Sequence, residues 1–443
     1  MAAVALALDG DLLSFLFAGV FAFLLAGVPV SMALAGSSLL YVLLAGRPPD
    51  VVVIHRMVGG VNSFPLLAIP FFILAGSLMN TAGITERIFG FAKAMFGWLR
   101  GGLGHVNVGA SVIFAGMSGA AVADAGGLGT IEIKAMRDAG YDPGFAVGVT
   151  AASSTIGPII PPSLPMVIYA VMAPNTSVGE LFVAGFLPGL AMAVALMVMI
   201  AYYARVRSYP RDAAFSLGAL GQSFARALLS LGTPVIIVGG ILTGAFTPTE
   251  AAIAAVVYAL FLGLVVYRTL TVGRLLKVSM ETIETTAIIL LIVAGASIFA
   301  WILTSNRVTE AFAAWILTVT DNPILILLLI NLILLVVGCF METIAAITIL
   351  VPVLLPIVTR PEIGMDPIHF GVMMVLNLMI GLLTPPVGMV LYVLSRVSKL
   401  SFERCAAATA PFLIPLVAVL MLVTFVPALS MWLPTLIYRS AGG

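Results

Sequence analysis

Two stretches of the chain combine hydroxyl or amide side chains with a glycine and a pair of prolines. One runs Ser153-Ser154-Thr155-Ile156-Gly157-Pro158-Ile159-Ile160-Pro161-Pro162, and the other runs Asn377-Leu378-Met379-Ile380-Gly381-Leu382-Leu383-Thr384-Pro385-Pro386. Each follows an Asp-Pro step, Asp142-Pro143 or Asp366-Pro367, at the same 20-residue distance from the Asp to the last proline. Prolines in an apolar helix free backbone carbonyls where there is no water to bind them. The pattern therefore predicts two broken helices that build a solute site at the middle of a membrane.

The composition is that of a membrane protein. Of 443 residues, 62% are hydrophobic and 9% are charged, and the mean hydropathy is +1.20; soluble domains have about 25% charged residues. Six apolar runs approach the roughly 20 residues that cross a bilayer: 12–25, 181–202, 251–266, 283–303, 324–337 and 406–427. We therefore expect an all-α polytopic membrane protein, because a β-barrel would show short alternating strands.

Several function classes are disfavoured by what the sequence contains. The formal net charge of +1 argues against binding to nucleic acid. Cys339 and Cys405 stand in apolar context, which predicts neither a disulfide framework nor a metal site. The N-terminus has no basic region before its first apolar run, so we expect no cleaved signal peptide. The sequence has no Walker phosphate loop, His-Glu-x-x-His or Gly-x-Ser-x-Gly motif and no potassium-channel filter. Uphill transport would need an ion gradient or another subunit.

The chain divides into two halves at an offset of about 224 residues, set by the Asp-Pro and Pro-Pro pairs. A looser match joins Val28-Pro29-Val30 to Thr247-Pro248-Thr249. Each half also has an apolar segment that is interrupted near its middle, with arms too short to cross comfortably. We predict two re-entrant hairpins with tips at membrane depth, built from 106–114 and 120–133 around 116–119, and from 324–337 and 342–355 around 338–341.

The charges predict that the two halves are inverted, because Lys and Arg prefer the cytoplasmic side. Hairpin one has Arg100, Lys134 and Arg137 at its base, and the loop 173–179 after the first broken helix has no basic residue. In the second half the order reverses: the hairpin base has Arg360 beside Asp321, Glu362 and Asp366, and the broken helix is followed by Arg396, Lys399 and Arg404. The rule fails at Arg47 and Arg56, which leaves the number of crossings before Phe64 open.

These features define a predicted domain organisation. Residues 1–100 form scaffold helices and the arm of the first repeat. Residues 173–320 form connecting and scaffold helices, with a cytoplasmic amphipathic segment at 208–231 on the membrane surface or against a partner. Residues 101–172 form the first transport unit, a hairpin plus a broken helix, and 321–395 form the second. Residues 396–443 form a last scaffold helix. The fold class we predict is an inverted-repeat, elevator-type transporter with two re-entrant hairpins and two broken helices.

The first candidate site lies where hairpin tip one would meet the first broken helix. Ser118 offers a hydroxyl at the tip, and Ser153, Ser154, Thr155 and the unwound Gly157 offer hydroxyls and carbonyls, which suit Na⁺. Two alternatives stay open. The small residues at the tip are also typical of tight helix packing, and the hydroxyls can bond back to their own helix.

The second candidate site is the corresponding place in the second half, and its residues are Gly338, Glu342, Thr343, Asn377, Gly381 and Thr384. Asn377 is an amide in an apolar run, where it is expensive unless used. Glu342 is an acid inside a membrane segment, and such a residue is a functional candidate by default. It could balance a cation, take a proton, or cap the helix that follows at its first turn.

Other polar residues favour structural interpretations. We expect Asp124 and Glu250 to be first-turn acids, Glu132 to pair with Lys134 or Arg137 near the surface, and His55, His105 and His369 to be surface residues. The pairs Gly185-x-x-x-Gly189 and Gly240-x-x-x-Gly244 predict close helix packing.

Five motifs in order resemble the large membrane subunit of TRAP (tripartite ATP-independent periplasmic) transporters over essentially the whole chain. They are Pro70-Phe71-Phe72-Ile73-Leu74-Ala75-Gly76, Ser118-Gly119 with Ala123-Asp124, Gly157-Pro158-Ile159-Ile160-Pro161-Pro162-Ser163, Phe246-Thr247-Pro248-Thr249-Glu250-Ala251-Ala252 and Thr384-Pro385-Pro386-Val387-Gly388. The chain departs from the family at two positions. Ala120 stands where the family often has Ser, so tip one has one hydroxyl fewer for side-chain ligation. Glu342 stands where Asp is common.

The resemblance implies a multi-pass importer of the bacterial inner membrane that is driven by Na⁺ and works by an elevator mechanism. It implies two partners, a small four-helix membrane subunit on a separate chain and a periplasmic binding protein that delivers a small organic anion. We expect the anion to contact the hairpin amides, one residue of tip one and residues of both breaks, namely Ser118, Pro161, Ser163, Thr384 and Pro385. The alternatives are a stand-alone Na⁺/dicarboxylate symporter of related hairpin architecture, a channel, and a membrane enzyme, for which no nucleophile–base signature is present.

Overall fold

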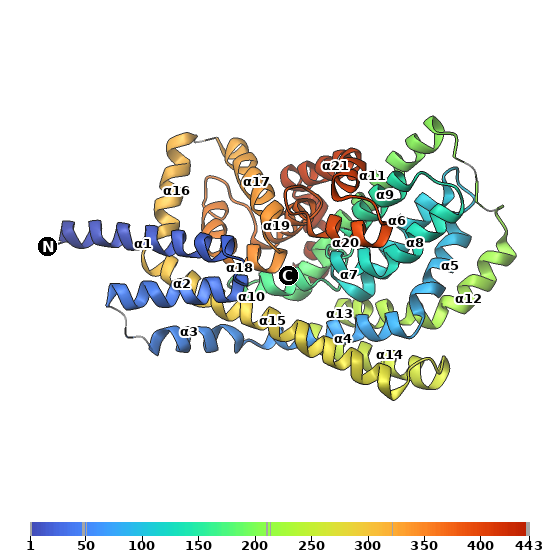
Figure 1. Cartoon of the computed structure of the whole chain (residues 1–443), viewed down its shortest axis with the longest axis horizontal. Helices are drawn as coiled ribbons and strands as arrows, with labels where there is room; N and C mark the ends of the chain where they lie inside the picture. Colours follow the sequence, from blue (N-terminus) through green and yellow to red (C-terminus); the bar gives the residue numbers. More distant parts are fainter. Residues whose placement is uncertain are drawn as a thin grey trace.

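The computed structural model is a set of packed helices, the longest of which run along the long axis of the molecule (Figure 1). It describes residues 2–46, 49, 51–209, 211–212, 214–320 and 322–439, and the side chains of 2–11, 118, 309, 313, 317, 319 and 439 also stand outside the description. Seven of the described helices are long and apolar enough to cross a membrane. The expected all-α polytopic fold is confirmed. Arg47 and Asp321, which the charge pattern used, lie outside the described residues.

The N-terminal helices pack side by side with one long helix from the middle of the chain. The 34-residue helix α15 (Val272–Ser305) contacts α2, α3, α4 and α18, and in Figure 1 it runs across the lower half of the molecule. The N-terminal helices and the short helix after α15 have these bounds: α1 Ala2–Leu25, α2 Val30–Ala45, α3 Val51–Val61, α4 Ala68–Thr81, α5 Ile84–Phe96 and α16 Val308–Val319.

The first half contains the expected hairpin and broken helix. The first arm is α6 (Gly102–Ser118), and the chain turns at Gly119, whose φ of +62° favours glycine because it has no Cβ. The second arm is divided by Gly127 into α7 (Ala121–Gly126) and α8 (Leu128–Asp138). The broken helix comprises α9 and α10, Pro143–Ser154 and Leu164–Met172.

The second half has the same order of elements. Its hairpin comprises α17 (Pro323–Phe340) and α18 (Thr343–Val358), and its broken helix comprises α19 (Pro367–Gly381) and α20 (Met389–Ser398). In both halves the hairpin packs against the broken helix that follows it, α6 and α8 against α9 and α17 against α19. The 224-residue repeat is therefore a repeat of structure as well as of sequence.

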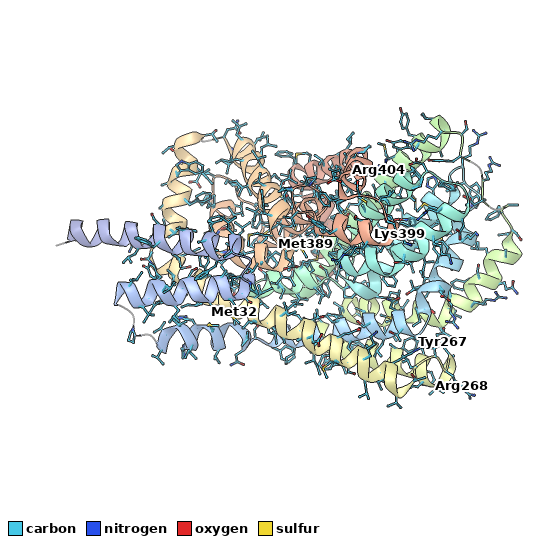
Figure 2. The ribbon with its side chains drawn as sticks, viewed as in Figure 1. Met32, Tyr267, Arg268, Met389, Lys399 and Arg404 are labelled. Atoms are coloured by element: carbon cyan, nitrogen blue, oxygen red, sulfur yellow. The ribbon has the colours of Figure 1, made fainter. Side chains whose placement is uncertain are left out.

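The remaining helices connect and flank these units. The 29-residue helix α11 packs against α6, α9, α10 and α19, and so touches both units. In Figure 2 Arg268, Lys399 and Arg404 lie on one side of the molecule, with Met32 and Met389 farther towards the other. The bounds are α11 Val178–Val206, α12 Leu217–Pro234, α13 Gly240–Leu242, α14 Pro248–Phe261, α21 Phe402–Phe425 and α22 Ala428–Pro434, with π-helical turns at Val235–Gly239, Leu262–Val266 and Thr435–Arg439.

The predicted amphipathic helix over 208–231 has different bounds. Helix α12 begins at Leu217, where the Ser216 hydroxyl accepts a hydrogen bond from the Ala219 amide at 3.3 Å. The helical course continues to Leu242, which gives 26 residues, enough for a membrane span. The described part of 207–212 is a non-helical connector, because Ser208 has a left-handed φ of 52° and Arg211 pairs with Arg100 in an antiparallel bridge.

Candidate functional site

The first break is a buried, irregular segment between α9 and α10. Its backbone leaves the helix after Ser154 and re-enters it at Leu164, and all residues from 155 to 163 are buried. Ser163 begins the new helix, since its hydroxyl accepts from the Met166 amide at 3.2 Å and donates to the Pro158 carbonyl. The peptide bonds Pro161–Pro162 and Pro385–Pro386 are both cis.

The three hydroxyls before the first break all donate hydrogen bonds. Ser154 Oγ donates to the Ala151 carbonyl at 2.8 Å, and Thr155 Oγ1 donates to the Ala152 carbonyl at 2.6 Å. Ser153 Oγ donates to Asn107 Oδ1 at 2.5 Å. Ser153 Oγ also donates to the Thr150 carbonyl at 3.2 Å, so bonding back to the helix, the open alternative for this triplet, is present at all three residues. It does not use up the hydroxyls, because a donating hydroxyl keeps oxygen lone pairs that can accept.

Hairpin tip one lies directly against the first break. A methyl group added at Gly119 would lie 2.4 Å from the Pro162 carbonyl oxygen, and one added at Gly157 would lie 2.1 Å from Asp124 Oδ2. Asp124 is in the first turn of α7, as expected, and is buried. Its carboxylate therefore lies at candidate site one, although the sequence predicted for Asp124 only the structural role of a first-turn acid. Ser118 ends α6, and its side chain lies outside the described residues.

Hairpin tip two approaches the second break most closely through the backbone of two glycines. A methyl group added at Gly381 would lie 2.6 Å from the carbonyl carbon of Gly338 and 2.7 Å from its Cα. Close by, the Val387 amide donates to the Cys339 carbonyl at 3.3 Å. Two predicted glycines of site two are thus brought together, and only glycine permits this approach.

Glu342 and Thr343 begin the second arm of hairpin two. Glu342 Oε2 accepts from the amides of Ile344 at 2.8 Å and Ala345 at 3.2 Å, which is helix capping, one of the three roles proposed for this acid. Thr343 Oγ1 is buried and has no hydrogen-bond partner among the described residues. Thr384 Oγ1 donates to the Ile380 carbonyl at 2.9 Å. Of the predicted side-chain oxygens of site two, those of Glu342 and Thr384 therefore form hydrogen bonds within the described residues, whereas that of Thr343 does not.

Asn377 is held by an asparagine that the sequence analysis did not single out. Its Nδ2 donates to both the backbone oxygen and Oδ1 of Asn331, each at 2.9 Å. Its own Oδ1 is buried and lacks a hydrogen-bond partner within the described chain. A buried polar atom of this kind is costly, and it points to a ligand or ion.

The same arrangement occurs in the first half. Asn107 on α6 accepts from Ser153 and donates from Nδ2 to Thr150 Oγ1 at 2.7 Å. Positions 107 and 331, and positions 153 and 377, are each separated by 224 residues, the offset of the repeat. Extending that offset to the first hairpin arms would have identified both asparagines.

Two interpretations of ionisable residues were wrong. Glu132 is buried and makes no ion pair with Lys134 or Arg137 within the described part of the chain; it lies near enough to Asp124 to interact with it electrostatically. His105 and His369 are buried as well, and His369 Nε2 contacts the Val423 carbonyl at 2.6 Å, whereas His55 is exposed as expected. Glu132, His105 and His369 lie on helices of the hairpin and broken-helix units, and the packing of these helices buries them. The distribution of charges along the sequence does not predict that burial.

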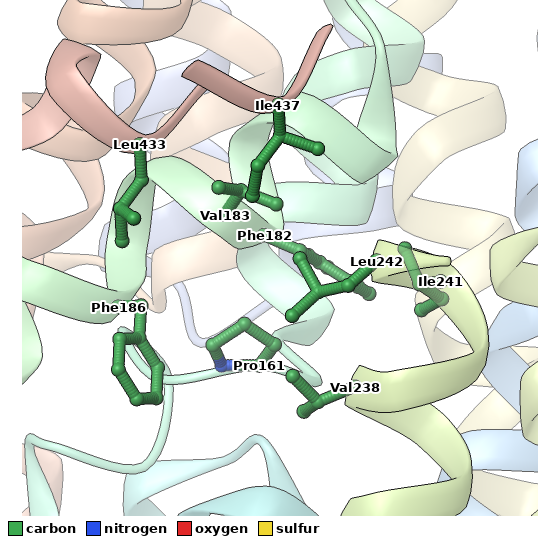
Figure 3. Close-up of a pocket in the computed structure, with 9 residues that line it drawn as sticks. All are labelled: Pro161, Phe182, Val183, Phe186, Val238, Ile241, Leu242, Leu433 and Ile437. Atoms are coloured by element: carbon green, nitrogen blue, oxygen red, sulfur yellow. The ribbon is translucent and has the colours of Figure 1, made fainter. Parts of the chain in front are cut away.

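The predicted substrate contacts differ between the breaks. Pro161 lines an entirely apolar cavity of about 160 Å³ between α11, α13 and the C-terminal helices (Figure 3). No group there can pair with a carboxylate, so Pro161 can offer an anion only apolar contact from this side. Ser163 is buried, whereas Thr384 is half-buried and Pro385 is exposed. The second break is therefore the accessible one in this conformation.

Helix packing around the first break uses the expected small-residue pair. Methyl groups added at Gly185 and Gly189 of α11 would lie 2.2 Å from the Ile159 carbonyl oxygen and 2.3 Å from an Ile160 side-chain carbon. The Gly-x-x-x-Gly pair thus packs against the break itself. Tyr169 then joins the halves, because its hydroxyl donates to the Pro367 carbonyl at 2.6 Å.

The donor set at both sites suits a hard monovalent cation. The described residues include no group of three or more His, Cys, Asp and Glu side chains that could hold a metal ion. The sites offer hydroxyl, amide and irregular backbone oxygens, and Asn377 Oδ1 and Thr343 Oγ1 have no hydrogen-bond partner among the described residues. Unwound backbone and oxygen side chains of this kind coordinate Na⁺ in membrane transporters, so the residues present fit that ion.

Hairpins packed on broken helices within a polytopic helical fold define a membrane transporter. Two solved transporter structures share this fold: Alcanivorax borkumensis YdaH, with a TM-score of 0.56 at 15% identity over 85% of this chain and 89% of that one, and Neisseria gonorrhoeae MtrF, with 0.54 at 12% over 85% and 84%. The chain belongs to the family of the tripartite ATP-independent periplasmic transporter, DctM component, whose model matches residues 17–429.

Characterised relatives agree with the family model. The chain is 50% identical over 413 residues to the sialic acid TRAP transporter large permease protein SiaM of Vibrio cholerae, covering 93% of this chain and 96% of the relative. It is 44% identical to the sialic acid permease protein SiaT of Haemophilus influenzae, of which it covers 66%, and 43% identical to the C4-dicarboxylate large permease protein DctM of Pseudomonas aeruginosa, of which it covers 86%.

The expected family is thereby confirmed. The chain is a transporter subunit rather than an enzyme, and a multi-pass protein of the bacterial inner membrane. TRAP large permeases work with a small membrane subunit and a periplasmic binding protein, so family membership favours the multi-subunit transporter over the stand-alone symporter.

Proposed function

We propose that this chain imports a small organic acid by Na⁺-coupled transport. The observation that carries the proposal is the paired arrangement of each hairpin tip against each break, with Asn107–Ser153 in one half and Asn331–Asn377 in the other. Two similar oxygen-rich sites at equivalent positions are what cooperative Na⁺ binding at both tips requires. The Na⁺ charge would make the region between the tips attractive to a carboxylate.

We propose an elevator mechanism for the movement. In this proposal the hairpins and broken helices form the moving body. Helix α15, which packs against α2, α3 and α4 and borders the moving body at α18, forms the scaffold with the N-terminal helices. The opposite membrane orientation of the two halves is part of this proposal, and it rests on the distribution of Lys and Arg. An ion can shift the equilibrium only by its differential affinity for the two states, so ion and anion must share the tips.

Sialic acid is the first substrate to test, because the relative with half of its residues identical is named for it. C4-dicarboxylates come second, for the same reason of relatedness. We propose that a periplasmic binding protein delivers the acid and that a separate small subunit of four helices completes the transporter, with specificity divided between the binding protein and the residues near Thr384 and Pro385.

Uptake into proteoliposomes tests the proposal. The chain is reconstituted with its small subunit and binding protein, and uptake of labelled sialic acid or succinate is followed with and without an inward Na⁺ gradient. We expect uptake that needs both the gradient and the binding protein. Equal uptake without Na⁺ refutes the coupling, and full uptake by the chain alone supports the stand-alone symporter instead.

A further inference from the structure

The connector after α11 forms a basic cavity at the end of the helix bundle. The cavity has a volume of about 480 Å³ and is lined by Arg100, Arg205, Ser208, Tyr209 and Arg211 together with Ala204. Arg205 comes from the last turn of α11, Arg100 from the loop between α5 and α6, and Arg211 from the connector itself. Three separate segments therefore bring their guanidinium groups to one cavity.

Two of these arginines are held in an electrostatically unfavourable pair. Arg100 and Arg211 are partners in an isolated antiparallel bridge, which places their side chains next to each other. Like charges directly opposite on paired strands are destabilising. None of the three cavity arginines forms an ion pair with a carboxylate among the described residues. A bound anion would turn this repulsion into attraction.

The nearby acids are occupied elsewhere. Asp212 Oδ2 accepts from the Leu103 amide at 2.8 Å and from the Tyr141 hydroxyl at 2.5 Å. Asp142 pairs with Arg207 at 3.5 Å. The hydrogen bonds of Asp212 thus hold the connector next to the start of α6, where Arg100 and Arg211 pair. They do not place a carboxylate against the arginines of the cavity.

The surroundings of the cavity are apolar and interfacial. It lies at the end of the membrane span Val178–Val206, where Tyr202 and Val206 are exposed. Trp98 packs edge-on against Phe215, with ring centroids 5.7 Å apart, and both are exposed. Exposed aromatic rings beside basic residues at the end of a span are typical of the headgroup region.

We propose that this cavity binds the phosphate of an anionic phospholipid in the cytoplasmic leaflet. Guanidinium groups match phosphate oxygens in pairs, and basic pockets between membrane helices recognise phospholipid headgroups. The exposed side chains of α11 and α12 would contact the acyl chains. The bound headgroup would neutralise Arg100 and Arg211 and stabilise the connector that holds the start of α6.

Lipid binding to the purified complex tests this proposal. Native mass spectrometry compares phosphatidylglycerol with phosphatidylcholine of the same acyl chains, for wild type and for Arg100→Gln, Arg205→Gln and Arg211→Gln, singly and together. We expect each substitution to weaken phosphatidylglycerol binding about fivefold and the triple variant about 100-fold. The matched control removes the same charge from exposed sites outside the cavity, with Arg274→Gln, Arg396→Gln and Arg404→Gln, and should bind like wild type.

A second measurement applies in bilayers and guards against misfolding of the triple variant. The fluorescence of Trp98 is taken as the difference between wild type and Trp98→Phe. Brominated phosphatidylglycerol should quench this fluorescence more strongly than brominated phosphatidylcholine. Each single arginine substitution should reduce the difference in quenching between the two lipids. Equal binding of both lipids, or wild-type affinity in the cavity variants, overturns the proposal. Displacement of phosphatidylglycerol by millimolar inorganic phosphate would assign the cavity to a free anion and would overturn the lipid assignment.

Discussion

At the scale of single residues, Asn377 is the best-defined candidate for the proposed ion site. Its amide nitrogen is held by Asn331 at two points, and its buried Oδ1 has no hydrogen-bond partner among the described residues. The asparagine pair separates two functions that a lone polar residue would combine. Asn331 positions the side chain, and Asn377 Oδ1 is left for a ligand.

Substituting each asparagine distinguishes these functions. Both Asn377→Ala and Asn331→Ala break the pair, and each should cost about 1–3 kcal/mol of stability because a buried polar group loses its partner. The concentration of Na⁺ that gives half-maximal uptake should rise about tenfold or more in Asn377→Ala, which also loses the oxygen, and less in Asn331→Ala. Equal shifts in the two variants would show that Asn377 has only a structural role.

Gly157 provides a second prediction at this scale. In Gly157→Ala the added methyl would collide with the Asp124 carboxylate, and overpacking of this kind costs about 1–3 kcal/mol. We expect a lower melting temperature and loss of Na⁺-dependent uptake. Gly273→Ala on α15 is the matched control, because nothing lies within 4 Å of the added methyl, and it should leave uptake unchanged. Normal Na⁺ dependence in Gly157→Ala would move the ion away from break one.

At the scale of elements, the start of α18 tests the role of Glu342. Both capping bonds use Oε2, and Asp is a good capping residue. Glu342→Asp should therefore retain stability, whereas Glu342→Ala should lose about 1 kcal/mol. Thermal unfolding measures the stability of each variant, and uptake with and without Na⁺ measures its Na⁺ dependence. If Glu342→Gln retains stability but loses Na⁺ dependence, the charge acts beyond capping.

The connector at 207–212 is the second element with a testable role. Asp212 accepts hydrogen bonds from the start of α6 and from Tyr141, and burial together with the hydrogen bond to Asp212 raises the pKa of Tyr141, which keeps this phenol protonated as a donor. Asp212→Ala should speed hydrogen exchange at the Leu103 amide about 10- to 100-fold. Asp138→Ala, an exposed acid in the same region, is the control. Unchanged exchange at Leu103 would mean that α6 is stabilised without the connector.

At the scale of the whole molecule, the two breaks differ in accessibility although their sequences correspond. Ser163 is buried beneath α11, whereas Val387, 224 residues later, is half-buried beside the exposed Pro385. A symmetric repeat in an asymmetric conformation is what a transporter that alternates between two states requires.

Cysteine labelling tests that alternation. With Cys339 and Cys405 replaced by Ala, a thiol at Val387→Cys should react faster with a water-soluble maleimide than one at Ser163→Cys. Na⁺ with substrate should change the ratio of the two rates, because the ligand can bias only states that it binds differently. Ser216→Cys, at the exposed start of α12, reports any general change in reagent access. A ratio that never changes would contradict movement of the two breaks between accessible states.

Much of the architecture followed from local sequence. The apolar runs, the Asp-Pro steps and the two Gly-x-x-x-Pro-Pro breaks specify where helices begin and end, because proline and glycine act on the backbone within a few residues. The helices Pro143–Ser154 and Pro367–Gly381 accordingly start and stop where those motifs stand. The 224-residue repeat also followed from spacing alone.

The contacts between segments were decided by the tertiary structure. Burial of Glu132 and His369, the approach of Asp124 to Gly157 and the pairing of Asn331 with Asn377 depend on how distant helices pack, and no local pattern encodes that packing. The same holds for Arg100 and Arg211, which are far apart in sequence and adjacent in space. The sequence by itself determined the helices, their breaks and the two-fold repetition, and only the folded chain decided which oxygens and charges meet, because that depends on long-range packing.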